Sequence, residues 1–149
     1  MQFANTVVVG APRERVWAFL LDVHTLSQCV PGLQRMEVLE AGRAFGGIAS
    51  LDLGPSTVNF PARVEWVEQE ALRRGRLRAL ARFSQYLVEG EGTLELADDP
   101  GGTRLSWHIG VVLPQELGDN QMMRRLVRTF TARFLKEFFE CVLHGLEAV

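Results

Sequence analysis

The sequence lacks several features that would assign it to a special class of protein. It has only two cysteines, Cys29 and Cys141, which form neither a CxxC pair nor the Cys/His spacing of a metal site. No apolar stretch approaches the ~18 residues that a membrane-spanning helix needs, and no basic segment followed by an apolar run marks a secretory signal. These absences predict a cytoplasmic protein with two buried free thiols and no metal ion.

An excess of charge of one sign is also missing. Sixteen Lys and Arg residues against 18 Asp and Glu residues leave a net charge of −2, which gives no overall attraction to nucleic acid or to an anionic membrane. Hydrophobic residues make up 47% of the chain, which excludes a disordered protein. Because the 149 residues contain no linker and no internal repeat, the sequence predicts one domain over residues 1–149.

Hydrophobic periodicity divides the chain into three parts. Residues 3–9 alternate as a strand, and a helix follows that begins at Pro12, with a second helical turn over residues 25–29. From residue 33 to residue 113 apolar and polar residues alternate, and turns divide this region into six strands. Residues 119–147 contain no proline and predict a long helix with a wide apolar stripe.

The short connections between consecutive strands predict an antiparallel meander. One face of this sheet is apolar and the other is charged, so we expect the sheet to be covered on one side only. The predicted fold class is therefore α+β, in the order β-α-α-β-β-β-β-β-β-α, with a curved antiparallel sheet around the C-terminal helix.

This order of elements resembles the helix-grip fold of the START, Bet v 1 and polyketide-cyclase-like (SRPBCC) superfamily. A more specific resemblance is carried by segments spread over nearly the whole chain: Ala11 to Asp22, Cys29-Val30-Pro31-Gly32, Leu53-Gly54-Pro55 with Phe60, Gly101 to Leu105, and Phe134 to Phe139. In these segments the chain is similar to the CoxG family of carbon monoxide dehydrogenase subunits. The resemblance implies a non-enzymatic accessory of a molybdenum-type dehydrogenase, acting in maturation, membrane recruitment or coupling to quinones.

A hydrophobic cavity is expected between the sheet and the long helix. Small residues recur on the predicted inner face, and they would leave room for an apolar ligand such as an isoprenoid quinone or a fatty acid. They are Gly47, Ala49, Ala62, Ala79, Ala81, Gly90 and Gly92. The predicted ligand-binding residues are Phe60, Trp66, Phe83, Tyr86, Trp107, Met123, Val127, Phe130 and Phe134. In the alternative interpretation, the small residues accommodate bulky side chains and the core is solid.

Basic residues gather in two places. One cluster lies on a strand and comprises Arg73, Arg74, Arg76, Arg78 and Arg82, and the other lies along the long helix and comprises Arg124, Arg125, Arg128, Arg133 and Lys136. A solvated outer face is the ordinary explanation. The functional one is docking of a partner protein or of the inner face of a membrane through Arg124, Arg125, Arg128 and Arg133. Nucleic-acid binding is not expected, because the nearby aromatic residues belong to the inward stripe.

Two alternatives fit the same fold. A cyclase- or dehydratase-like enzyme would need a histidine or a carboxylate facing Tyr86 in the pocket. His24, His108 and His144 lie far apart in the sequence, so we assign no catalytic residue, no required cofactor and no metal ligand. A ligand-free interaction module would instead have a solid core.

Overall fold

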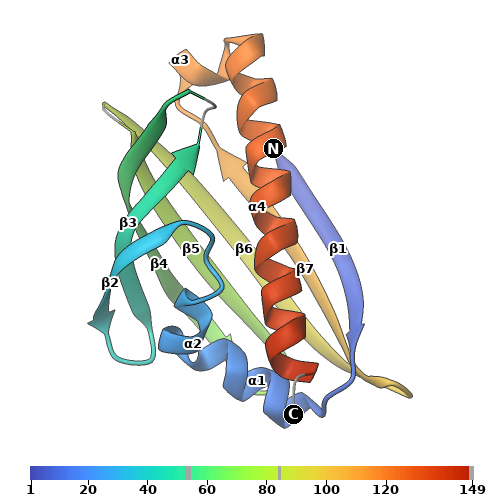
Figure 1. Ribbon diagram of the computed structural model, residues 1–149. Coiled ribbons are helices and arrows are strands. Elements are labelled where there is room, and N and C mark those ends of the chain that lie inside the picture. The colour runs from blue at the N-terminus through green and yellow to red at the C-terminus, as the bar shows by residue number, and fades with distance from the viewer. Residues whose placement is uncertain (53–54, 84, 148–149) are drawn as a thin grey trace.

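The computed structural model describes residues 1–52, 55–83 and 85–147, so Leu53 and Gly54 of the family resemblance lie outside the described residues. The strands are β1 (Gln2–Val9), β2 (Leu33–Glu40), β3 (Ala44–Asp52), β4 (Thr57–Glu70), β5 (Arg74–Phe83), β6 (Tyr86–Asp99) and β7 (Gly102–Val112). The helices are α1 (Arg13–Leu21), α2 (Val23–Ser27), α3 (Gln115–Gly118) and α4 (Gln121–Glu147). Figure 1 shows the expected order of elements, with the addition of the short helix α3.

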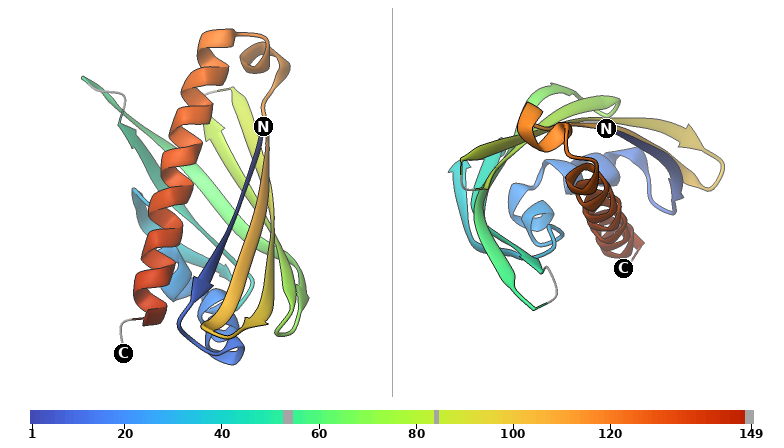
Figure 2. Two further views of the ribbon diagram at one scale, coloured as in Figure 1. Left: turned by 90° about the vertical axis from the view of Figure 1, so that its right-hand side faces the viewer. Right: turned by 90° about the horizontal axis from the view of Figure 1, so that it is seen from above.

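The strands form one antiparallel sheet in the order β1-β7-β6-β5-β4-β3-β2. Figure 2 shows that the sheet bends around α4, with α1 and α2 inside one end of the curve. In the register, Ala62 lies opposite Ala81 and Ala79 lies opposite Gly90. Because side chains alternate between the faces of a strand, these small residues share the inner face with the buried Trp66. The α+β helix-grip architecture predicted from the periodicity is confirmed.

The two N-terminal helices begin close to their expected positions. Pro12 has an extended backbone and lies immediately before the first residue of α1. The sequence predicted Pro12 as the first residue of this helix, and that position is wrong by one residue. Helix α2 begins after Asp22, whose carboxylate accepts hydrogen bonds from the Thr25 hydroxyl (2.9 Å) and from the backbone N–H of His24 and Thr25. These bonds, first of all the one from the Thr25 hydroxyl, lower the pKa of Asp22.

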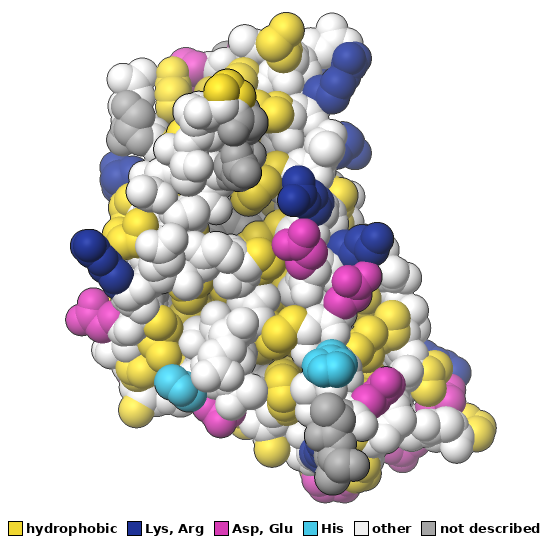
Figure 3. All heavy atoms as spheres, viewed as in Figure 1, with side chains coloured by type: hydrophobic (Ala, Val, Ile, Leu, Met, Phe, Trp, Pro, Cys, Tyr) yellow, Lys and Arg dark blue, Asp and Glu magenta, His cyan; other side chains and the backbone are white. Residues whose placement is uncertain are grey.

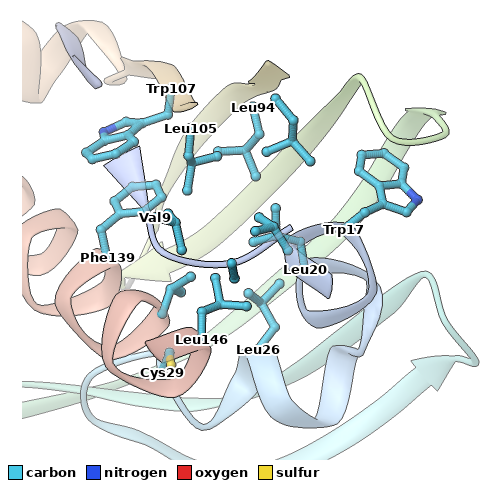
Figure 4. Close-up of a cluster of buried hydrophobic side chains, with 14 of the residues drawn as sticks. Val9, Trp17, Leu20, Leu26, Cys29, Leu94, Leu105, Trp107, Phe139 and Leu146 are labelled. Atoms are coloured by element: carbon cyan, nitrogen blue, oxygen red, sulfur yellow. The ribbon is translucent and has the colours of Figure 1, made fainter. Parts of the chain in front are cut away.

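The hydrophobic core occupies the end of the grip that holds α1 and α2. Figure 4 shows Leu94 and Leu105 of the sheet meeting Leu20, Leu26 and Leu146 of the helices. The ring of Trp107 stacks on Phe139 of α4 with centroids 3.7 Å apart (Figure 4). Burial of this size supplies the main driving force for folding, at about 25 cal/mol per Å² of apolar surface.

The two cysteines form a disulfide, so the prediction of free thiols is wrong. Cys29 follows α2, Cys141 lies in α4, and their Cα atoms are 5.4 Å apart although 112 residues separate them in the sequence. The physical reason is that α4 brings the end of the chain back onto the corner after α2. No spacing within the sequence reveals such a contact, and the expected cytoplasmic setting loses the support of free thiols.

The outer face of the sheet carries paired charges. Arg78 and Glu89 form an ion pair at 2.8 Å, which raises the pKa of the Arg78 guanidinium. Arg76 lies 3.3 Å from Glu91 and 3.7 Å from Glu68. Arg73 and Arg74 both pair with Glu70. The basic cluster on this strand is therefore largely neutralised by neighbouring carboxylates, as a solvated face would be.

Candidate functional site

The half of the grip farthest from α1 and α2 is incompletely filled. In α4 the buried residues are Phe139, Val142 and Leu146, all in its C-terminal part, and no residue from Gln121 to Phe138 is buried. Most inward-facing residues of the sheet at this end are likewise only half-buried, and Phe60 is a buried exception. Figure 3 shows hydrophobic side chains in a hollow between α4 and the strands on the β3 side. This half is the candidate binding site.

Four small residues form the floor of this site, and we call them the small-residue floor: Ala62, Ala79, Ala81 and Gly90. They lie side by side on β4, β5 and β6, and all four remain half-buried. A Cβ atom placed on Gly90 would find its nearest neighbours 3.8 Å and 3.9 Å away, which is ordinary contact. A methyl group would therefore fit at Gly90 without a clash, and the four residues of the floor are not fully covered by the protein.

The other small residues of the inner face are packed against neighbouring parts of the chain. A Cβ atom on Gly47 would lie 2.6 Å from the backbone oxygen of Gln34, at the point where the register between β2 and β3 is irregular. A Cβ atom on Gly92 would lie 3.0 Å from the side chain of Ile109, and Ala49 is itself buried. The expectation that all seven small residues open a cavity is thus wrong for these three, which pack against neighbouring chain.

Three of the nine predicted ligand-binding residues lie on the strands that carry the small-residue floor, and four lie on the half-buried stripe of α4. Phe60 and Phe83 lie together with ring centroids 4.0 Å apart, and Tyr86 sits at the start of β6 opposite Phe83. From α4, Met123, Val127, Phe130 and Phe134 are all half-buried. These residues supply apolar walls of the kind that ligand pockets use.

The remaining two predicted residues belong to the core. Trp66 is 2% exposed, packs against Trp17 at 6.3 Å between ring centroids, and leaves no room for a side chain on Gly75. Trp107 is stacked on Phe139. Because their rings are covered by protein, these two tryptophans form the closed end of the grip instead of a ligand contact.

The structure has an open pocket at the rim of the sheet, and most of its lining residues were not predicted from the sequence. It has a volume of about 600 Å³ and is lined by Gln85, Tyr86, Leu87, Glu89, Val112, Leu113, Pro114 and Glu116. Of these residues only Tyr86 was predicted. The signal available in the sequence was Pro114, which follows β7 and precedes α3. The pocket lies where β6 begins and β7 ends, and Glu89 contributes to it from the outer face of the sheet.

The titratable residues are distributed away from the floor. His24, His108 and His144 are exposed and lie on three different elements. Glu89 and Glu91 point to the outer face, where they pair with arginines. Among residues 1–52, 55–83 and 85–147, no group of three His, Cys, Asp or Glu side chains is placed to hold a metal ion.

The arginines of α4 are exposed, and Figure 3 shows basic side chains along this helix. Arg133 pairs with Glu137 at 3.4 Å. In the part of the chain that the structure describes, no ion pair involves Arg124, Arg125 or Arg128. Near them, Met122 and Leu126 are 78% and 46% exposed. The first turns of α4 thus combine positive charge with exposed apolar side chains.

Within the described residues, no helix is both long and apolar enough to cross a membrane.

Several solved structures share this fold. A conserved protein from Geobacillus kaustophilus has a TM-score of 0.82 at 15% identity, with 98% of this chain and 95% of that chain covered. The Zhui aromatase/cyclase from Streptomyces sp. R1128 has a TM-score of 0.73 at 19% identity, with coverage of 99% and 93%. For Ara h 8.0201 the TM-score is 0.66 at 13% identity, with coverage of 96% and 97%. At these identities the similarity shows the fold alone.

The sequence itself places the chain in a family. A comparison with curated protein sequences finds no match. The model of the CoxG family, which describes a carbon monoxide dehydrogenase component, matches residues 6–146, which is nearly the whole chain. The chain therefore belongs to the CoxG family of carbon monoxide dehydrogenase subunits.

Proposed function

We propose that this protein is a non-enzymatic carrier for a lipophilic molecule, an isoprenoid quinone or a fatty acyl lipid, and that it serves a carbon monoxide dehydrogenase or a related molybdenum hydroxylase. Membership of the CoxG family supports the association with such an enzyme. The carrier role is supported by the site, in which the small-residue floor faces the half-buried stripe of α4.

The observation that carries the proposal is the incomplete burial of apolar side chains on the inner face. Phe130 and Phe134 lie on the stripe of α4 that should be covered, yet both stay half-buried. A lipophilic guest covering about 300 Å² of this surface would contribute several kcal/mol before the cost of association, at about 25 cal/mol per Å². The protein gains this energy only when a ligand completes the packing.

A bulky residue on the floor tests the carrier role. In Ala79→Phe the new ring occupies the space above Gly90, so we expect bound lipid or quinone to fall roughly tenfold or more while the fold is retained. The measurement is mass spectrometry of an organic extract of purified protein, together with titration of added quinone and fatty acid. Ala97→Phe is the matched control, because Ala97 is exposed on the outer face of β6.

Two results would contradict the carrier role. One is equal ligand recovery from both variants. The other is wild-type protein that yields no ligand and binds neither added quinone nor added lipid, which would favour an interaction module with a solid core.

We also propose that the start of α4 docks on an anionic membrane surface. The support is the combination of Arg124, Arg125 and Arg128 with the exposed Met122 and Leu126. Each arginine near an anionic surface contributes about 1 kcal/mol, and exposed apolar side chains can enter the interface.

Charge reversal tests the docking surface. We expect Arg125→Glu with Arg128→Glu to lower the affinity for vesicles containing phosphatidylglycerol by about tenfold or more. Arg82→Glu, an exposed change on the outer face of β5, should have little effect. Co-sedimentation with these vesicles and with neutral phosphatidylcholine vesicles measures the difference. Equal binding by the α4 variant and the control would exclude this surface.

A further inference from the structure

Helix α4 is held by its C-terminal part. Phe139 stacks on Trp107, and Val142 and Leu146 are fully buried in the core. The backbone at Gly145 lies against Phe19 of α1, where an added Cβ atom would come within 2.8 Å of the ring. Residues 121–138 contain no buried residue, although Leu135 and Phe138, next to the anchor, are partly buried and pack against the core. Helix α4 is therefore held mainly by its C-terminal part, and no residue from 121 to 134 belongs to the core or packs against it.

The disulfide lies within this anchor. Cys141 lies between Phe139 and Val142 in the sequence of α4, and its bond to Cys29 connects α4 to the corner between α2 and β2. Helix α4 is also held by packing contacts with α1 and β1. The disulfide adds a covalent link to the α2 corner, which restrains the direction in which the free part of α4 can move.

The two cysteine residues differ in their exposure to solvent. Cys29 is 5% exposed, and its backbone N–H donates to the carbonyl oxygen of Leu26 at 3.0 Å. Cys141 is only half-buried, on a helix whose neighbouring residue Glu140 is exposed. We therefore expect a thiol from solution to attack the bond from the Cys141 side.

We propose that Cys29–Cys141 is a reversible redox site that sets how firmly α4 is held over the binding site. Opening of the bond loosens residues 121–138 and speeds the exchange of a lipophilic ligand. The last step rests on the proposed carrier function, whereas the control of α4 does not.

The chemistry is thiol–disulfide exchange with a dithiol reductant. One thiolate of the reductant attacks Sγ of Cys141, the Sγ–Sγ bond breaks, and Cys29 leaves as a thiolate that takes up a proton. The second thiol of the reductant then attacks the mixed disulfide and releases Cys141 as a thiol. Two electrons pass to the protein, and the reductant becomes an internal disulfide. An oxidised dithiol reverses the sequence. The chain has only two cysteines, so no other pairing within it competes.

Hydrogen exchange of the full chain, before and after reduction with dithiothreitol, tests the control of α4. Thiol counting establishes the redox state. At labelling times too short for global unfolding to contribute, we expect amide exchange in residues 121–138 to rise about tenfold on reduction, while peptides from β4 to β6 change less than about twofold. Cys29→Ser and Cys141→Ser should both show the fast pattern with and without dithiothreitol, which separates the bond from other effects of the reductant.

Three results would overturn the redox site. The first is unchanged exchange in α4 after confirmed reduction. The second is an equal rise throughout the sheet, which would make the disulfide a brace of the whole fold. The third is a chain that keeps two free thiols after incubation with oxidised glutathione.

A fluorescent fatty-acid analogue tests the link to ligand exchange. We expect its dissociation rate to rise about fivefold or more when the bond is reduced. An unchanged rate beside faster exchange in α4 would overturn this link. Failure of the analogue to bind the oxidised chain would count against the carrier function instead, and hydrogen exchange would still decide the redox site.

Discussion

Replacing Cys141 with serine is expected to lower the free energy of unfolding by about 2–4 kcal/mol and the midpoint of thermal unfolding by roughly 5–15 °C. A bond between distant residues removes conformational freedom mainly from the unfolded chain. Here the closed loop contains every strand from β2 to β7, and the partners are 112 residues apart. Urea unfolding followed by circular dichroism, in the absence of reductant, measures the change.

The wild-type chain supplies the control for this substitution. Addition of dithiothreitol should bring its unfolding midpoint down to that of Cys141→Ser, whereas the midpoint of the variant should not move. Identical midpoints for the oxidised wild type and the variant would contradict a stabilising role of the bond. The packing of Val142 and Leu146 is retained in both proteins, so the comparison isolates the covalent link.

The fold could be predicted because each part of the chain repeats one local pattern. On β5, Leu77 and Ala79 face the helix while Arg76 and Arg78 face solvent, so simple alternation assigns every side chain to its face. The long helix was recognisable because its stripe repeats over residues 119–147. Helix α3 was missed because four residues are too few to show a helical period.

The site was harder to predict because the closeness of the helix to the sheet varies along the grip. Trp107 and Phe83 look alike in their strands, since each is an inward aromatic residue. The structure covers Trp107 with Phe139 but leaves Phe83 half-buried beside Phe60. The difference depends on where α4 approaches the sheet, which is a property of packing between distant segments.

The small residues of the inner face show the same limit of prediction from local sequence patterns. Gly90 and Gly92 are two positions apart on one face of β6, so a sequence pattern treats them alike. A Cβ atom on Gly92 would be tight against Ile109, whereas a Cβ atom on Gly90 would make only ordinary van der Waals contacts. The pleat repeats along the strand, but the side chains that neighbouring strands contribute do not. The disulfide belongs to this class as well, because it reports a tertiary contact and not a local pattern.

A pair of phenylalanines on α4 separates the packed end of the grip from the open end. We expect Phe139→Ala to lower the free energy of unfolding by about 3–5 kcal/mol, because Phe139 is 4% exposed and the deletion leaves a cavity beside Trp107. Phe130→Ala removes the same side chain from a half-buried position, so we expect a loss of about 1 kcal/mol. Urea unfolding of the two variants measures both values.

Ligand binding should respond in the opposite order. Phe130 belongs to the half-buried stripe of α4 that we propose contacts the ligand, so Phe130→Ala should weaken binding of a fluorescent fatty-acid analogue by about tenfold, at conditions where both variants are folded. Phe139→Ala should leave that affinity within about twofold, because Phe139 belongs to the core at the other end. Equal losses of stability for the two substitutions would mean that α4 is packed uniformly along its length. The open half of the grip would then not exist, and neither would the space that the carrier function needs.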